Sequence, residues 1–130
     1  MRAHHIAIFT RDLARLEAFY TQVLGFPVVR RWDAPGIVFV DAGGLWLELT
    51  RQDASDDGTR PRALDQGVGI NHLALQVGDV ERSFQKLVEQ GVRVLSAPLD
   101  YENVRVAFLA DPDGNVLELI EDDQRPRTKD

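Results

Sequence analysis

The sequence predicts an α+β fold made of two tandem β-α-β-β-β modules. Two observations carry this prediction. A pattern of one strand, one helix and three strands occurs twice in the 130 residues, and residues at matching points of the two copies recur at nearly constant spacing. The spacing is 67 residues for His5 and His72 and for Asp12 and Asp79, 66 for Gly25 and Gly91, and 70 for Asp41 and Asp111 and for Glu48 and Glu118.

The first module is expected over residues 2–50. Residues 2–9 alternate as in a strand with one buried face, with Ile6 and Ile8 expected on one side. Thr10 or Asp12 is expected to cap a helix whose apolar residues share one face, and which runs from Asp12 to Leu24 and ends at Gly25. Turns rich in aspartate and glycine then separate three expected strands: Val28–Trp32, Ile37–Asp41 and Leu45–Thr50.

The second module is expected over residues 70–121, after a polar linker over residues 51–69 that shows no periodicity. It repeats the order of the first, with a helix capped by Asp79 and ended by Gly91. A strong turn, Asp111–Asn115, precedes the last strand. The expected strands are Ile70–Val77, Val92–Ser96, Val104–Leu109 and Val116–Glu121. Residues 122–130 are charged and are expected to form a frayed tail.

The amino-acid composition excludes several classes of protein and of site. Hydrophobic residues make up 44% and charged residues 28% of the chain, as in soluble globular proteins. The absence of cysteine excludes a disulfide framework, a thiolate metal site and a cysteine nucleophile. The net charge of −6, without a basic run, disfavours nucleic-acid binding. No apolar stretch has the length of a membrane span and no signal peptide is recognisable, so a cytoplasmic location is expected.

Four polar residues interrupt the strands at matching positions. His5 and His72 open the first strand of each module, and Glu48 and Glu118 lie in the last, all opposite the aliphatic face of their own strand. Two imidazoles and two carboxylates suit a divalent metal, Ni²⁺, Co²⁺, Mn²⁺, Fe²⁺ or Zn²⁺, and leave two octahedral positions for water or substrate. Such a metal acts as a Lewis acid while a carboxylate beside it moves a proton.

A simpler interpretation also exists for these residues. A single histidine or glutamate on a strand is usually a polar residue on the wet face of an antiparallel sheet. Repetition of the same residue types at matching strands favours a metal site, although duplication by itself would preserve the pairs without a metal.

Beyond these patterns, the chain resembles the vicinal oxygen chelate superfamily, which includes glyoxalase I, bleomycin-resistance proteins, fosfomycin-resistance enzymes, methylmalonyl-CoA epimerase and extradiol dioxygenases. The matching segments span residues 4 to 121. They are His5–Ile8, Asp12–Leu13 with Phe19–Phe26, Trp46–Thr50, Asn71–Leu75 and Asp111–Leu119.

The resemblance implies that the two modules curl into a cup around a metal held by His5, Glu48, His72 and Glu118. That set is similar to the set of glyoxalase I, and it implies a metal-dependent lyase or isomerase acting on a small hemithioacetal or α-hydroxycarbonyl substrate. Glu118 or Glu48 would be the catalytic base. The resemblance also implies a homodimer.

The alternatives are another reaction on the same scaffold, or a metal-free binding protein of the bleomycin-resistance type. The other reactions would be epimerisation, extradiol dioxygenation or thiol addition to an antibiotic. The chain is expected to be shorter than glyoxalase I, and the extended loops that would grip glutathione are not recognisable in the sequence.

Two further groups of residues are candidates for substrate contacts. Linker arginines suit a carboxylate-bearing substrate, but solvated side chains are the commoner outcome; they are Arg51, Arg60 and Arg62. Aromatic residues at strand spacing are usually core, which is the expectation for Trp32, Phe39 and Tyr101. Trp46 is expected to line the site, because it shares the face of Glu48.

Overall fold

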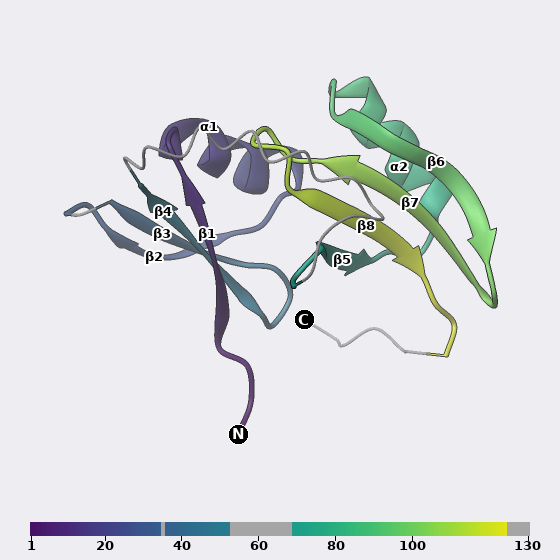
Figure 1. Cartoon of the computed structure of the whole chain (residues 1–130), viewed down its shortest axis with the longest axis horizontal. Coiled ribbons are helices and arrows are strands. Elements are labelled where there is room, and N and C mark those ends of the chain that lie inside the picture. Colours follow the sequence, from purple (N-terminus) through teal and green to yellow (C-terminus); the bar gives the residue numbers. More distant parts are fainter. Residues whose placement is uncertain (35, 53–68, 125–130) are drawn as a thin grey trace. The chain divides into compact units, whose positions relative to one another are not determined.

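The structure, a computed structural model, describes residues 1–34, 36–52 and 69–124. The chain divides into two compact units, Met1–Thr59 and Arg60–Lys129. In each unit the order is one strand, one helical segment and three strands (Figure 1). Most of the expected linker, residues 53–68, and the end of the expected tail, residues 125–130, lie outside the described residues.

The first unit contains a four-stranded mixed sheet in the order β1-β4-β3-β2. β1 and β4 pair in parallel, and the other neighbours are antiparallel. The elements are β1 (His5–Thr10), α1 (Leu13–Ala18), a π-helical turn η1 (Phe19–Val23), β2 (Val28–Trp32), β3 (Ile37–Asp41) and β4 (Trp46–Arg51).

The second unit repeats this topology as β5-β8-β7-β6, again with its first and last strands parallel. Its elements are β5 (His72–Gln76), α2 (Val80–Glu89), β6 (Arg93–Tyr101), β7 (Val104–Ala110) and β8 (Val116–Glu121). The predicted α+β fold of two β-α-β-β-β modules is therefore confirmed. No helix in the described ranges is both long enough and apolar enough to span a bilayer.

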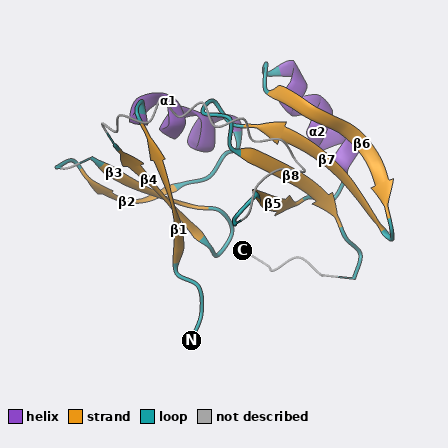
Figure 2. Ribbon diagram, in the orientation of Figure 1, coloured by secondary structure: helices purple, strands orange, loops and turns teal. Residues whose placement is uncertain are grey.

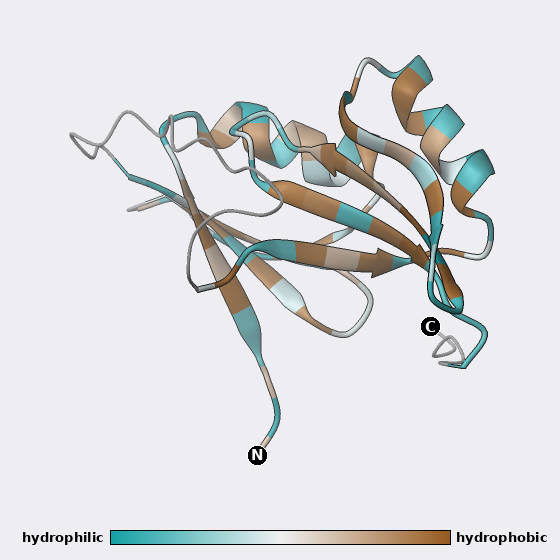
Figure 3. Cartoon of the chain, turned by 45° about the vertical axis from the view of Figure 1, so that its right-hand side comes forward, coloured by the Kyte–Doolittle hydropathy of each residue, from teal (hydrophilic) through white to brown (hydrophobic). Residues whose placement is uncertain are grey.

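Each helix covers one face of its own sheet (Figure 2). Alternation along a strand sends every second side chain toward that helix, and these side chains form the core of the unit. In the first unit the fully buried residues are Leu16, Tyr20, Val38, Val40, Leu47 and Leu49, and in the second they include Val80, Leu109 and Leu117. Hydrophobic and hydrophilic residues are interspersed along helix α2, as in an amphipathic helix with one buried face (Figure 3).

The caps and stops predicted from the repeat are confirmed. The Asp12 carboxylate accepts a hydrogen bond from the Arg15 amide at 3.1 Å, and Asp79 accepts one from the Arg82 amide at 3.0 Å. Gly25 and Gly91 both have φ of +82°, a left-handed conformation that glycine adopts at low cost.

Two elements differ most from the sequence prediction, and β5 is also shorter than the expected Ile70–Val77. The expected helix over residues 12–24 changes to a π-turn after Ala18. The Thr21 hydroxyl donates to the Glu17 carbonyl at 2.7 Å, and such bonds compete with the α-helical ladder. Strand β6 continues beyond the expected end at Ser96, because a register shift between Ser96 and Leu99 takes up Pro98.

The aspartate of the turn before β8 provides a test of stability. Asp111 is buried and accepts hydrogen bonds from the Asp113 and Asn115 amides and from the Asn115 side chain. The matching Asp41 is only half-buried and accepts from two exposed glycine amides. We expect Asp111→Ala to lower the free energy of unfolding by about 1–3 kcal/mol, and Asp41→Ala by less than about 1 kcal/mol. Urea titration of both variants measures this difference, and equal losses would contradict it.

Candidate functional site: two histidine–glutamate pairs

The parallel strand pair of each unit brings a histidine beside a glutamate. In the first unit Ala7 of β1 pairs with Glu48 of β4, so His5 lies two residues earlier on the same face. In the second unit Ala74 of β5 pairs with Glu118 of β8, and His72 lies two residues earlier. The four residues predicted from the sequence therefore form two equivalent pairs, one in each unit.

The two pairs differ in how closely their atoms approach. His72 Nε2 lies 3.0 Å from Glu118 Oε1, whereas His5 Nε2 lies 3.6 Å from Glu48 Oε1. The histidine side chains are about one-third exposed, at 36% for His5 and 34% for His72, while the glutamates are 18% and 12% exposed. Each pair thus combines a largely buried carboxylate with an imidazole that is accessible to an incoming ion or molecule.

The residue before each histidine contacts the other ring nitrogen. Asn71 Oδ1 lies 2.9 Å from Nδ1 of His72, so the His72 Nδ1–H donates to an acceptor. Glu118 is a second acceptor at Nε2, and a neutral imidazole has only one N–H. The tautomer with hydrogen on Nδ1 therefore leaves a lone pair on Nε2, the atom that would bind a metal ion. At His5, the Nδ1 atom lies 2.8 Å from Nδ1 of His4.

The carboxylates also differ in their support. The Thr50 hydroxyl donates to Glu48 Oε2 at 2.8 Å, which leaves Oε1 toward His5. The equivalent position beside Glu118 is Ile120, which has no hydroxyl. Among the described residues, His72 is the polar side chain in contact with Glu118. Glu48 is therefore held on two sides and Glu118 on one.

A phenylalanine packs against each histidine; sequence reasoning assigned Phe39 to the core and did not consider Phe108. Phe39 pairs with Glu48 across β3 and β4, and Phe108 pairs with Glu118 across β7 and β8. The ring of Phe39 lies 5.4 Å from His5 at 87°, and that of Phe108 lies 5.7 Å from His72 at 87°. This edge-to-face geometry is a favourable one for aromatic pairs. The available signal was their common place in the repeat, 69 residues apart.

The described segments contain no cluster of three or more histidine, aspartate or glutamate side chains arranged to hold an ion. Each unit by itself contributes one nitrogen and one carboxylate, which is half of the donor set expected from the sequence.

Comparison with known proteins identifies the family. Residues 2–119 match the family model described as the Glyoxalase/Bleomycin resistance protein/Dioxygenase superfamily. The chain belongs to this superfamily. It is 34% identical to the uncharacterized protein YwkD of Bacillus subtilis, over 91% of the chain and 94% of that protein. It is 31% identical to the lactoylglutathione lyase of Salmonella typhimurium, over 93% of both. A glyoxalase family protein from Enterococcus faecalis has a TM-score of 0.76, with 29% identity over 92% of this chain and 97% of that one.

Aromatic residues surround the first pair of this superfamily member. Trp46 shares the face of Glu48, as predicted, and contacts the rings of His4 and Phe39 at 5.1 and 5.8 Å. Phe39 is buried, as expected, but the core prediction is wrong for Trp32 and Tyr101, which are 48% and 65% exposed. Trp32 lies on β2, the edge strand of its sheet, and Tyr101 lies at the end of β6.

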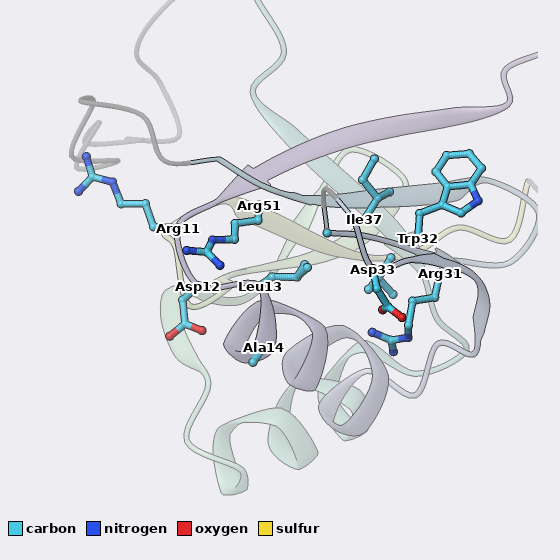
Figure 4. A pocket seen from close by; sticks show the side chains of 11 residues that line it. Arg11, Asp12, Leu13, Ala14, Arg31, Trp32, Asp33, Ile37 and Arg51 are labelled. Carbon is cyan, nitrogen blue, oxygen red and sulfur yellow. The ribbon is translucent and has the colours of Figure 1, made fainter.

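A cavity of about 370 Å³ in the first unit does not include either histidine–glutamate pair. It lies where β1 passes into α1 (Figure 4). Its lining residues are Arg11, Asp12, Leu13, Ala14, Arg31, Trp32, Asp33, Gly36, Ile37, Val38 and Arg51. Arg31 donates two hydrogen bonds to Glu17, at 3.0 and 2.6 Å, and these bonds raise the pKa of its guanidinium above the ordinary value. Arg51, a candidate for substrate binding, faces this cavity, while Arg60 and Arg62 lie outside the described residues.

Proposed function

We propose that this protein is a divalent-metal-dependent lyase or isomerase of the glyoxalase type, acting on a small hemithioacetal or α-hydroxycarbonyl substrate. His5, Glu48, His72 and Glu118 are the proposed metal ligands. The observation that carries the proposal is the equivalent histidine–glutamate pair in each unit, with Nε2 facing a carboxylate oxygen. The relatives named lactoylglutathione lyase, at about 31% identity, support the reaction class.

The donor spacing fits a metal ion. Two ligands in adjacent octahedral positions, each about 2.1 Å from the ion, are about 3.0 Å apart. Nε2 of His72 and Oε1 of Glu118 are 3.0 Å apart. The corresponding atoms of His5 and Glu48 are farther apart, at 3.6 Å. Nε2 of His72 and the Glu118 carboxylate would hold such an ion, while Asn71 would orient the imidazole through Nδ1.

The set of two imidazoles and two carboxylates suits Ni²⁺, Co²⁺, Mn²⁺, Fe²⁺ or Zn²⁺. Such an ion, when bound, supplies Lewis-acid stabilisation of negative charge on the substrate oxygens.

In the proposed reaction a glutamate carries the proton between two neighbouring carbons. The carbon that bears sulfur loses its hydrogen as a proton to the carboxylate, and the adjacent carbonyl carbon receives one from the same group. The hydroxyl proton passes to the former carbonyl oxygen, so the product is an α-hydroxy thioester. Phe39 and Phe108 keep the imidazoles in place through edge-to-face packing.

Glu118 is the better candidate for this base. A carboxylate that takes up and returns a proton must reorient, and Glu48 is restrained by the Thr50 hydroxyl at 2.8 Å. Glu118 has no such restraint, because Ile120 occupies the matching position. Glu48 is then the fixed ligand and Glu118 the mobile one.

The metal content of the purified protein tests whether it binds a metal at all. We expect the chain, expressed without a histidine tag and reconstituted with each candidate ion, to retain about one equivalent after dialysis, and His72→Ala to lose most of it. Elemental analysis measures the bound metal, and Glu89→Gln on the exposed face of α2 is the control. Less than about a tenth of an equivalent in the unmodified chain, unchanged by His72→Ala, would defeat the metal-enzyme assignment.

Turnover of a hemithioacetal tests the assignment of the base. We expect Glu118→Gln to lower kcat by about 10²–10⁴-fold with metal retained, because an amide cannot accept the proton. Glu48→Gln is expected to affect metal affinity more than kcat. A larger loss of kcat in Glu48→Gln than in Glu118→Gln would reverse the two roles.

We also propose a homodimer, and mixing experiments test whether the metal site is shared between its chains. If each site takes one unit from each chain, a heterodimer of His5→Ala and His72→Ala subunits contains one site with both histidines. Random mixing is then expected to restore about a quarter of the unmodified activity, measured after co-refolding. Activity that stays at the level of the separate variants would show that each site is built within one chain.

A further inference from the structure

The two units differ at one position in an otherwise matching row of side chains. In the first unit the row across β2, β3 and β4 is Arg30, Phe39 and Glu48. In the second unit the corresponding row is Ser96, Phe108 and Glu118. Directly opposed residues on neighbouring strands project to the same face. Arg30 therefore lies on the face of the His5–Glu48 pair, and the second unit makes the same row without an arginine.

Three aromatic rings hold the Arg30 guanidinium. Its central carbon lies 5.5 Å from the ring centre of Trp32, 5.6 Å from that of Phe39 and 5.2 Å from that of Trp46. A cation within about 6 Å of an aromatic face is attracted by the ring quadrupole. The rings fix the position of the guanidinium but accept none of its five N–H donors in conventional hydrogen bonds.

Arg30 has no carboxylate partner among the described residues, unlike the strand arginines Arg31 and Arg105. Arg31, on the other face, donates to both oxygens of Glu17, and Arg105 is bonded to Glu81 and Asp100. Within residues 1–34, 36–52 and 69–124, no carboxylate lies within ion-pair distance of Arg30. Its charge is thus positioned and available on an exposed face.

The guanidinium is also close to the proposed metal ligands. The Phe39 ring lies 5.4 Å from the His5 ring and 5.6 Å from the Arg30 guanidinium carbon, so these two groups are at most about 11 Å apart. The strand spacing gives a similar figure, since Arg30 and Glu48 are two strands apart at roughly 4.8 Å per strand. A small molecule can span this distance.

We propose that Arg30 binds a carboxylate group of the substrate, at up to about 10 Å from the reacting carbons. The planar guanidinium matches a carboxylate with two parallel hydrogen bonds, and the rings of Trp32 and Trp46 beside it offer apolar surface to the atoms that link the carboxylate to the reacting carbons. The substrate class is therefore an anionic hemithioacetal or hydroxycarbonyl compound. This inference rests on the proposed function for the reaction, but the binding step is tested without it.

The binding test uses the metal-free full chain and a pair of matched probes, benzoate and benzamide, which differ in charge. Because Trp32 and Trp46 flank Arg30, tryptophan fluorescence reports occupancy. We expect the unmodified chain to bind benzoate about tenfold more tightly than benzamide, Arg30→Met to remove this preference, and Arg82→Met on α2 to keep it. Arg30→Lys, which retains charge but loses the planar fork, is expected to be intermediate. Absence of the preference in the unmodified chain, or its persistence in correctly folded Arg30→Met, overturns the proposal.

Kinetics connect binding to substrate choice. With metal-loaded protein, the hemithioacetals of methylglyoxal with 3-mercaptopropionate and with its methyl ester differ in one charge. We expect Arg30→Met to raise KM about tenfold for the anionic substrate alone, with kcat little changed. An unchanged ratio of KM values overturns the substrate assignment. Failure of both substrates to react with any metal contradicts the proposed function, while the benzoate measurement still decides the role of Arg30.

Discussion

Parallel pairing of the first and last strand within each unit is the constraint on which the rest of the site depends. Histidine and glutamate lie more than forty residues apart in each module, and a parallel register brings them onto one face as diagonal neighbours. A shift of one residue in either strand would send the glutamate to the aliphatic side. The register is strongly specified because the alternate residues of β4 and β8 are buried leucines.

The same alternation produces the core and the polar face together. Leu47 and Leu49 are fully buried against the helical side of the first sheet, while Glu48 between them faces the other way. Burial of leucines on both sides of the glutamate position therefore fixes the direction of the carboxylate. On the polar face, Phe39 and Phe108 add a second layer of packing against the imidazoles. The same strands therefore bury the core residues on one face and orient the histidine and glutamate side chains on the other.

Short-range patterns explain what could be predicted from the sequence. The helix caps Asp12 and Asp79, the stops Gly25 and Gly91, and the faces of Glu48 and Glu118 all follow from spacings of a few residues within one element. The π-turn after Ala18 and the continuation of β6 through Pro98 depend on local competition between hydrogen bonds and on a register shift. The Phe39 and Arg30 contacts depend on which strands become neighbours, and strand periodicity alone does not contain that information.

Differences between the two units show which residues build the fold and which distinguish one histidine–glutamate pair from the other. Both units contain a histidine, a phenylalanine and a glutamate in the same arrangement, so these three residues do not distinguish one unit from the other. The first unit adds Thr50 against its glutamate and Arg30 on its outer strand, where the second has Ile120 and Ser96. Neither addition is needed to form the sheet, because the second unit forms an equivalent sheet without them. These additions give the His5–Glu48 pair a hydrogen-bond restraint and a neighbouring positive charge that the His72–Glu118 pair lacks. The proposed roles divide along the same line, with Arg30 of the first unit proposed for an anionic substrate and Glu118 of the second proposed for the proton transfer.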